Sequence, residues 1–427
     1  MHTKEHKRTL LSAIFLVAGT CIGGGMLALP IATGVGGFIP SLIMMFFCWM
    51  AMTISALLLL EVSLWMKQED AHVITMASTI LGPLGKAVAW GLFLFISYAS
   101  LVAYTAGGGV QVASALKHYA HIEVSNDMGR FLFLAIFSAV ISVGSWFVGR
   151  INSILFISMI AAYFGLVGLG IDEVKGSLLT YKNWDAALIG IPLLLTSFSF
   201  QTIVPSLTPY LKRNISHLRI AIIGGTTLAF LIYAVWQWMI LGIVPVTGPD
   251  GLQAALTQGD QPTTQFLQNH VHGSWIYGVA EYFAFFAIIT SFLGMALGLF
   301  DFLSDGLKIK KTNKGKIAIG LLIALPTLFI ATHLERAFMI AMEATGGFGD
   351  TLLNGMIPVL MIWIGRYRMK YTSDRIMPGG KPMLIGVFCF FLVSFTIAMM
   401  SQAGLLKGNI NEYELPLIHN PIEASSE

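Results

Sequence analysis

The sequence is short of charged residues. Asp, Glu, Lys and Arg together make up only 11% of its 427 residues, whereas 56% are hydrophobic. A soluble domain usually carries about 25% charged residues, because its surface must be hydrated. This deficit excludes a cytosolic enzyme, a nucleic-acid-binding protein and a disordered chain. We therefore expect a lipid bilayer to surround most of the protein, and no nucleic acid to be its partner.

Residues that mark an enzyme or a cross-linked protein are also scarce. The three cysteines, Cys21, Cys48 and Cys389, lie far apart, which excludes a disulfide framework and gives no metal-ligand spacing. No HExxH, GxSxG or P-loop motif occurs. We therefore expect no catalytic residue, metal, cofactor or ATPase subunit, while the oligomeric state stays open.

Long apolar stretches take the place of these features. Eleven of them, nearly free of charge, have about the length of 20 residues that a helix needs to cross a bilayer. They lie at about 10–31, 37–66, 86–117, 131–149, 151–170, 187–210, 218–244, 274–304, 316–333, 337–365 and 382–405. The first continues through Pro30 without a cleavage site, so we expect no cleaved signal peptide. The sequence predicts an all-α integral membrane protein with eleven transmembrane helices.

The positions of Lys and Arg predict the orientation in the membrane. Of the 25 such residues none lies deeper in a predicted span than its first or last two residues; 19 fall in or beside the N-terminal segment and every second loop after it, and six fall on the opposite side. Positive charge is enriched in the cytoplasmic loops of membrane proteins. We therefore expect a cytoplasmic N-terminus and, with an odd number of spans, a periplasmic C-terminal tail over residues 406–427.

Two predicted spans contain segments that disfavour a continuous helix. The first has four glycines within residues 19–25, followed by Pro30. The sixth has a polar run over 196–202 at bilayer depth, followed by Pro205 and Pro209. Non-helical backbone at that depth is tolerated where it is buried in protein or lines a cavity, and matched broken helices are typical of secondary transporters.

The two broken spans stand five spans apart, so they run in opposite directions, as an inverted repeat of five plus five helices requires. Close packing of small residues is the alternative explanation, and it suffices for Gly107–Gly109 in the third span. It explains the matched pair poorly. A ligand at such breaks would meet free N–H groups at half-helix N-termini and free carbonyls beside them, which together suit a zwitterionic amino acid.

Three stretches carry a family resemblance: Gly19-Thr-x-Ile-Gly-Gly-Gly-Met-Leu-x-Leu-Pro30, Thr290-Ser-Phe-Leu-Gly294 and Gly298-Leu-Phe-Asp-Phe302. With them the sequence resembles the hydroxy/aromatic amino acid permease family, and more narrowly the bacterial tyrosine- and tryptophan-specific permeases of the amino acid–polyamine–organocation superfamily. The resemblance covers essentially the whole chain. It implies a single transporter domain, residues 1–427, with the leucine-transporter fold. Its parts would be a first repeat at about 10–170, a second at about 187–365 and an extra C-terminal helix at about 382–405.

The resemblance also implies a substrate site. By position it assigns the substrate backbone to the breaks in the first and sixth spans, an aromatic hydroxyl to the third span, and a side-chain pocket to spans three, six and eight. The residues expected to bind substrate on this basis are Thr20, Cys21, Ile22, Gly23, Gly24, Gly25, Tyr98, Tyr104, Ser197, Phe198, Ser199, Phe200, Gln201, Phe286 and Ser291. Tyr98 and Tyr104 are alternatives for the hydroxyl.

Acidic side chains inside the predicted spans are candidates for ion coupling, because a charge at the bilayer centre is costly. They are Glu61, Glu281, Asp301, Glu343 and Asp350. Glu281 and Asp301 lie near span ends, where contact with headgroups or a helix cap explains them. In the fold that the resemblance implies, a carboxylate in the second span bonds the free backbone of the broken spans, so a structural and a proton-carrying role both stay open for Glu61.

The coupling ion that the resemblance implies is a proton. Some proton-coupled relatives carry a lysine in the fifth span, where this sequence has Asn152 and Ser153, so the carrier stays open. Further candidates are the hydroxyls near the second cation site of the implied fold and the acids that flank the glycine-rich segment 344–349. We expect that segment to be a third flexible point and a candidate gate. The ion-coupling candidates are Glu61, Thr290, Ser291, Glu343 and Asp350.

These features together predict a proton-coupled symporter for a small-molecule substrate. It would import tyrosine, tryptophan or both across the bacterial inner membrane by alternating access. Sodium coupling or a broader neutral amino acid specificity is the alternative. A channel or an intramembrane enzyme is a remote one, because eleven dissimilar spans do not suggest a symmetric filter and no catalytic motif is present.

Overall fold

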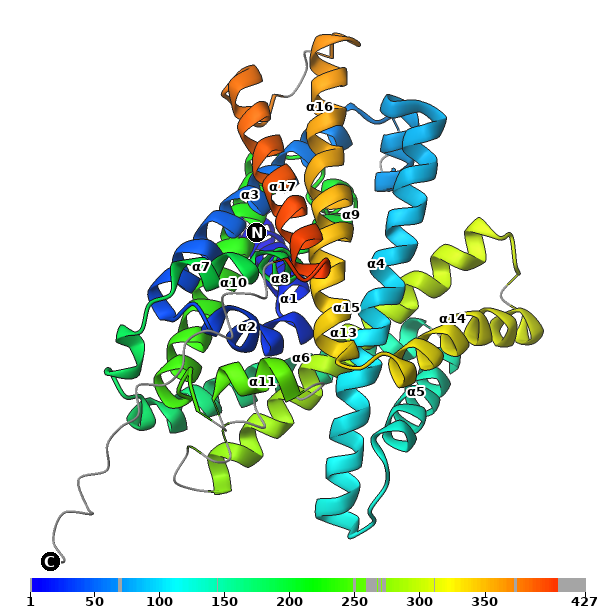
Figure 1. Ribbon diagram of the computed structural model, residues 1–427. Helices are drawn as coiled ribbons and strands as arrows, with labels where there is room; N and C mark the ends of the chain where they lie inside the picture. Colours follow the sequence, from blue (N-terminus) through cyan, green and yellow to red (C-terminus); the bar gives the residue numbers. More distant parts are fainter. Residues whose placement is uncertain are drawn as a thin grey trace, which may run out of the picture.

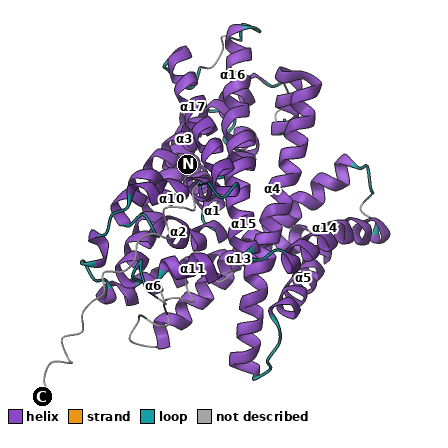
Figure 2. Ribbon diagram, in the orientation of Figure 1, coloured by secondary structure: helices purple, strands orange, loops and turns teal. Residues whose placement is uncertain are grey.

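The computed structural model describes residues 2–67, 71–143, 145–248, 251–258, 267, 270, 274–310, 312–371 and 375–405. Within these residues the protein consists of helices and connecting loops, as Figure 2 shows. The prediction of an all-α protein is therefore confirmed. The predicted C-terminal tail, 406–427, lies outside the described residues.

The helices follow the order of the predicted spans. The first half of the chain contains α1 His2–Cys21, α2 Gly24–Gly34, α3 Phe38–Trp65, α4 Val73–Ala120, α5 Asn126–Val143, α6 Ser145–Gly170, η1 Ile171–Glu173 and η2 Leu178–Thr180. The second half contains α7 Trp184–Ile189, α8 Ile191–Ser197, η3 Gln201–Ile203, α9 Val204–Tyr210, α10 Ile215–Ile243, α11 Leu252–Gln258, α13 Ser274–Gly306, α14 Asn313–His333, α15 Ala337–Ala344, the π-helix η5 Thr345–Met356, α16 Ile357–Tyr367 and α17 Gly380–Gln402.

Ten of the predicted spans correspond to helical segments that are long and apolar enough to cross a membrane. Among the described residues, nine such segments pass singly, one of them Ile191–Tyr210 with the interruption between α8 and η3, and the tenth is the pair α1–α2, whose two parts are bent by 54° at their break. The remaining predicted span, 131–149, is covered in part by the 18 residues of α5. The protein is therefore a multi-span helical membrane protein, while the count of eleven crossings and the division into two repeats stay predictions.

The helix that contains the third span begins earlier than expected. α4 starts at Val73 instead of near residue 86, and it bends at Gly82, which has φ +78° and precedes Pro83. Glycine tolerates this backbone conformation, and the following proline has no N–H to continue the helical hydrogen bonds. The segment 73–81, which the sequence predicted as part of a loop, is therefore a short helix in front of the span.

α4 divides the molecule in Figure 1. It runs nearly the full height of the view, with α5 and α14 on its right and α1, α3, α10 and α17 on its left. α13 packs along α6 and α4, α1 packs along α10, and α2 packs against α8. The two short broken helices α2 and α8 are thus enclosed by longer ones, and nearly all of their residues are buried.

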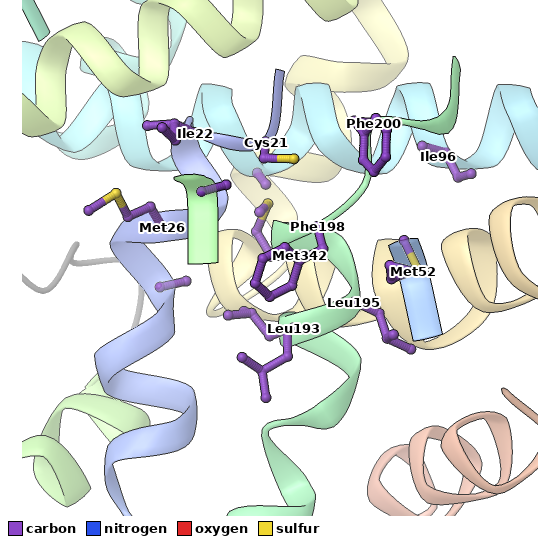
Figure 3. Close-up of a cluster of buried hydrophobic side chains, with 14 of the residues drawn as sticks. Cys21, Ile22, Met26, Met52, Ile96, Leu193, Leu195, Phe198, Phe200 and Met342 are labelled. Atoms are coloured by element: carbon purple, nitrogen blue, oxygen red, sulfur yellow. The ribbon is translucent and has the colours of Figure 1, made fainter. Parts of the chain in front are cut away.

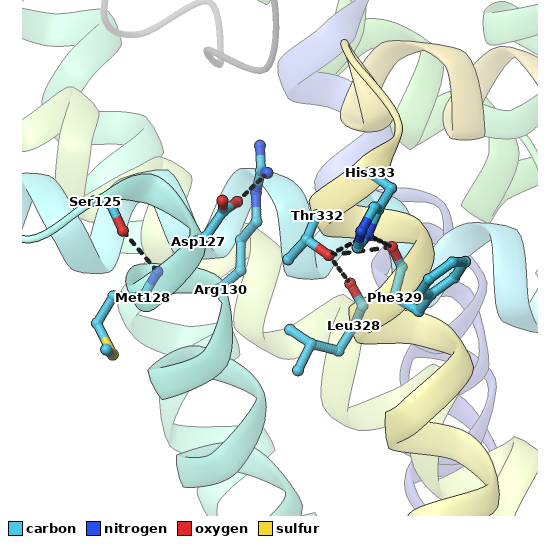
Figure 4. Close-up of polar contacts among 8 residues, drawn as sticks. All are labelled: Ser125, Asp127, Met128, Arg130, Leu328, Phe329, Thr332 and His333. Carbon is cyan, nitrogen blue, oxygen red and sulfur yellow. Dashed lines mark hydrogen bonds and ion pairs between the residues drawn. The ribbon is translucent and has the colours of Figure 1, made fainter.

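Three consecutive glycines in α4 allow neighbouring helices to approach closely: Gly108 and Gly109 face α5, and Gly107 faces Phe338 of α15. A Cβ on Gly109 would lie 2.6 Å from the backbone nitrogen of Arg130, and a Cβ on Gly108 would clash with the ring of Phe133. The explanation of Gly107–Gly109 by close packing is therefore confirmed. Figure 4 shows the same region: Arg130 pairs with Asp127 at 2.9 Å near the start of α5, beside the end of α14.

The tenth predicted span is widened and not broken. Residues Thr345–Met356 form a π-helix of 12 residues, a form that is frequent at functional sites. Its glycines bring neighbouring helices into contact: a Cβ on Gly346 would clash with the carbonyl oxygen of Pro192, and one on Gly355 would lie 2.5 Å from the ring of Phe391. The expected flexible point at 344–349 is thus packed against α8, and its role as a gate stays a prediction.

Candidate functional site

The breaks in the first and sixth spans meet at the centre of the molecule. α1 ends at Cys21 and α2 begins at Gly24, while α8 ends at Ser197 and helical structure resumes at Gln201. A Cβ on Gly25 would lie 3.2 Å from the Ser197 hydroxyl. Figure 3 shows the buried side chains that surround this meeting point. The predicted pair of broken helices is therefore present, and the two breaks contact each other.

A tyrosine on a third helix joins the two breaks. The hydroxyl of Tyr233, on α10, lies 2.6 Å from the carbonyl oxygen of Cys21 and 2.9 Å from that of Ser197. Both carbonyls stand at the C-terminal ends of broken helices, where backbone acceptors lack helical donors. The Tyr233 side chain is fully buried. It therefore satisfies both breaks with one hydroxyl group.

A tryptophan one turn further along α10 satisfies a backbone carbonyl beside the first break. The indole N–H of Trp236 donates to the carbonyl oxygen of Met26 at 3.0 Å. In a regular helix that carbonyl would accept from residue 30, but Pro30 has no N–H. Trp236 thus replaces the missing donor, and α10 holds both broken helices in a defined relation.

The N-terminus of α2 is hydrogen-bonded to a side chain of α13. The backbone N–H of Gly24 donates to the Ser291 hydroxyl at 2.9 Å, and a Cβ on Gly23 would clash with the same hydroxyl. Free N–H groups at a helix N-terminus suit an anion. The Ser291 hydroxyl therefore accepts a hydrogen bond from one of the backbone N–H groups that we expected to bind a carboxylate.

Of the two tyrosines expected in the third span, only Tyr104 lies at the break. A Cβ on Gly24 would lie 2.5 Å from the ring of Tyr104, which is buried. The hydroxyl of Tyr98 donates to the carbonyl oxygen of Leu322 on α14 at 3.0 Å. Tyr104, and not Tyr98, is the aromatic hydroxyl beside the broken helices.

A buried carboxylate lies beside the break in the sixth span. Asp350, in η5, accepts at its Oδ1 a hydrogen bond from the Ser199 hydroxyl at 2.6 Å and another from the Asn354 amide at 2.7 Å. The same amide donates to Ser199 at 3.1 Å, and the Ser55 hydroxyl donates to the carbonyl of Asn354. Among the described residues the second oxygen, Oδ2 of Asp350, is buried and has no hydrogen-bond partner. Such a group is costly to bury while it carries a charge.

The amide and aromatic side chains of the sixth-span break stabilise it from within. The Gln201 Oε1 accepts from the backbone N–H of Phe200 at 2.9 Å, and its Nε2 donates to the carbonyl of Met52 at 3.2 Å. Phe198 and Phe200 (Figure 3) are fully buried. The ring of Phe198 lies 5.2 Å from that of Tyr233, edge to face. These rings form the apolar wall of the break.

The other predicted site residues differ in exposure and contacts. The hydroxyl of Thr20 is exposed and donates to its own helix at Leu16, 2.7 Å away. The hydroxyl of Thr290 likewise contacts the carbonyl of Phe286 at 2.9 Å. The side chains of Cys21 and Ile22 are buried, and those of Phe286 and Glu343 are half-buried.

Glu61 is held by an arginine. The Nε and Nη2 groups of Arg366 donate to its two carboxylate oxygens at 2.6 Å each, and the backbone N–H of Ile376 adds a bond of 2.8 Å. The expectation that Glu61 bonds the free backbone of the broken spans is therefore wrong. The reason is that Arg366, just beyond the predicted end of the tenth span, turns inward and is buried.

Four residues that the sequence did not single out contact the broken helices or Asp350. They are Tyr233, Trp236, Gln237 and Asn354. The first three stand at helical spacing on one face of an otherwise apolar span, and that spacing was a usable signal. Asn354 had a weaker one, four residues after Asp350 on the same span.

Comparison with known proteins agrees with this architecture. The crystal structure of MhsT in complex with L-phenylalanine matches with a TM-score of 0.60 at 15% identity, over 92% of this chain and 98% of that one. The fold is thus the predicted leucine-transporter fold. The chain is 31% identical to the "Tyrosine-specific transport system 1" of Haemophilus influenzae, over 93% of this chain and 98% of the relative. It is 28% identical to the "Tryptophan-specific transport protein" of the same organism, over 94% and 98%.

A family description covers almost the whole chain as well. Residues 6–399 match the "Tryptophan/tyrosine permease family", in agreement with the resemblance seen in the glycine-rich segment of the first span. The members found here are named as transport proteins, so the chain is a transporter and not an enzyme. The protein described here belongs to the tryptophan/tyrosine permease family.

Proposed function

We propose that this protein is a proton-coupled symporter that imports aromatic amino acids, tyrosine and tryptophan first, across the bacterial inner membrane by alternating access. The names of its relatives support the substrate class. The observation that carries the proposal is the buried Asp350 carboxylate beside the sixth-span break, with its Oδ2 unpartnered among the described residues.

The substrate backbone would bind between the two breaks. Its carboxylate would take the Gly24 N–H, from which the Ser291 hydroxyl now accepts. Its ammonium would take the carbonyl oxygens of Cys21 and Ser197, which now share the single hydrogen of the Tyr233 hydroxyl. Each carbonyl oxygen has two lone pairs, and the Tyr233 hydroxyl has only one hydrogen to donate to the two oxygens. The hydrogens of the substrate ammonium would therefore donate to the lone pairs that the hydroxyl leaves free.

The aromatic ring of the substrate would pack among aromatic side chains of the site. Tyr104 touches the first break at Gly24, and Phe198 and Phe200 form the apolar wall of the sixth. Ring pairs in offset or edge-to-face arrangement add stabilisation beyond the area that they bury. This composition favours an aromatic substrate over a small aliphatic one.

Asp350 would carry the coupling proton. Its carboxylate bonds Ser199, which belongs to the non-helical part of the sixth span, so a change in its protonation alters the hydrogen bonds of the break. Sodium coupling through the hydroxyls of Thr290 and Ser291 is the second candidate. The proton is favoured because a buried titratable side chain contacts the Ser199 hydroxyl in the break of the sixth span.

We also propose the orientation with a cytoplasmic N-terminus. The guanidinium of Arg213, in one predicted cytoplasmic loop, donates to the carbonyl of Leu64 near the end of α3. Arg366, from another predicted cytoplasmic segment, pairs with Glu61 on the same helix. Loops assigned to one side by charge counting therefore meet at one end of the molecule, which supports the assignment.

Uptake by purified protein in proteoliposomes tests the proposal. Labelled tyrosine should accumulate when an inward proton gradient is imposed in sodium-free buffer, and liposomes without protein provide the control. Uptake that needs a sodium gradient and ignores the proton gradient would contradict the coupling assignment. Competition by each of the twenty amino acids should be strongest for tyrosine and tryptophan; equal competition by small aliphatic ones would contradict the substrate class.

A further inference from the structure

A cleft of about 540 Å³ opens where α16 ends and α17 begins. Its walls bring together parts of the chain that lie far apart in the sequence. They are Arg219 from α10, Arg366 from α16, the connecting residues Arg375, Ile376, Met377, Pro378 and Gly379, and Gly380 at the start of α17. Among the described residues that line it, none is acidic.

Two of the three arginines in this cleft have no counter-charge among the described residues. The charge of Arg366 is neutralised by its buried ion pair with Glu61. Arg219 and Arg375 are exposed, and within the described part of the chain neither has a hydrogen-bond or ion-pair partner. A guanidinium presents planar, paired donors that match the oxygens of a phosphate group. The cleft is therefore suited to a phosphate anion.

The backbone of the cleft adds to this preference. Gly379 and Gly380 have φ of +99° and +57° and lead directly into α17, a helix of 23 residues. The first N–H groups of a helix lack helical acceptors and attract anions. These donors reinforce the two free arginines.

The surroundings place the cleft at the level of lipid headgroups. The ammonium of Lys381 lies over the rings of Trp363 and Tyr367, 5.8 Å and 5.1 Å from their centroids. Aromatic and basic side chains gather at the membrane–water interface. Apolar side chains exposed on the adjoining helices, Ile220 on α10 and Ile385 on α17, continue from the cleft into the span.

We propose that this cleft binds the phosphate headgroup of an anionic phospholipid in the cytoplasmic leaflet, with the acyl chains along the exposed faces of α10 and α17. A soluble phosphate would supply the same charged group, but the aromatic and apolar borders of the cleft favour the lipid. The cleft loop also bonds the buried pair: Ile376 donates to Glu61 and Met377 accepts from Arg366. A bound lipid therefore stabilises the packing of α3 on α16. The inference uses the proposed orientation to name the leaflet and is independent of substrate and coupling ion.

Binding of labelled phosphatidylglycerol to the delipidated, full-length protein tests this inference. The double variant R219Q/R375Q should bind it roughly 30-fold more weakly than the unaltered protein. The control K310Q/K314Q removes two exposed charges from another loop on the same predicted side and should bind normally. Both variants should melt at the temperature of the unaltered protein when no lipid is added, since none of the four side chains has a partner among the described residues.

Three outcomes would overturn the inference. One is an equal loss of binding in K310Q/K314Q, which indicates nonspecific charge attraction. Another is equal affinity for phosphatidylcholine, whose headgroup has no net charge. The third is displacement of the lipid by inorganic phosphate or glycerol phosphate at equal concentration, which assigns the cleft to a soluble anion.

Discussion

Ser199 and Asp350 form a 2.6 Å hydrogen bond that joins the break of the sixth span to the π-helix of the tenth. Ser199 stands in the non-helical stretch between α8 and η3, and Asp350 is fully buried. Protonation turns a carboxylate, which only accepts hydrogen bonds, into a group that also donates one. The charge state of Asp350 and the geometry of the break are therefore coupled.

Replacing Asp350 with Asn should uncouple transport from the proton gradient. The amide keeps the size and much of the hydrogen bonding of the acid but cannot release a proton. We expect gradient-driven accumulation of labelled tyrosine to fall at least about tenfold, which corresponds to some 1.4 kcal/mol, while exchange of internal for external tyrosine continues. Both rates are measured in the same proteoliposome preparation.

Glu343→Gln provides the comparison for Asp350→Asn, because Glu343 lies on the same span and is half-buried. It should leave both accumulation and exchange nearly unchanged. The proton assignment to Asp350 fails if the Glu343 variant loses accumulation and the Asp350 variant retains it.

Glu61→Gln should destabilise the protein and lower accumulation and exchange equally. The substitution leaves the buried Arg366 charge without its counter-ion, a change that costs about 3–5 kcal/mol in other proteins. The melting temperature of the detergent-solubilised protein measures it. The double variant Glu61→Gln, Arg366→Gln should recover part of the loss, because no buried charge is then unpaired. Loss of accumulation with intact exchange and stability would instead identify Glu61 as a proton carrier.

Tyr233→Phe should weaken tyrosine binding about fivefold while the protein remains folded. The variant keeps the ring that packs on Phe198 but loses the hydroxyl that links Cys21 and Ser197, and one such hydrogen bond contributes about 1 kcal/mol. Equilibrium binding of labelled tyrosine measures the effect. Tyr163→Phe is a matched control, because its hydroxyl donates to the carbonyl of Ile232, away from the breaks. Equal losses in both variants would show that the role of Tyr233 is general packing.

Gly24→Ala should impair substrate binding more than insertion or folding. The added methyl group would meet the ring of Tyr104 at 2.5 Å, so this ring must move away from the break. Gly294→Ala is the control, since a Cβ there meets nothing within 4 Å although Gly294 belongs to one of the stretches that carry the family resemblance. Binding that survives Gly24→Ala unchanged would exclude close contact of Tyr104 with the substrate.

The membrane environment, most of the spans and the two breaks could be predicted from the amino-acid sequence. These depend on local properties: apolar length, the exclusion of Lys and Arg from spans, and the helix-disrupting effect of clustered glycines and prolines. The family resemblance depended on the glycine-rich segment together with the stretches 290–294 and 298–302, and the family match confirmed it. The short helix at 73–81 was missed because its kink at Gly82 and Pro83 hides it among loop residues.

Which side chains meet could be seen only in the packed molecule. Glu61 and Arg366 lie 305 residues apart in the chain, and Tyr233 reaches carbonyls on two other helices. Nothing in the local pattern separates Tyr104 from Tyr98, because both stand in the same span and only their direction around the helix differs. Partner choice depends on how packed helices are placed and rotated against one another, and that follows from the packing of the whole molecule and not from any segment alone.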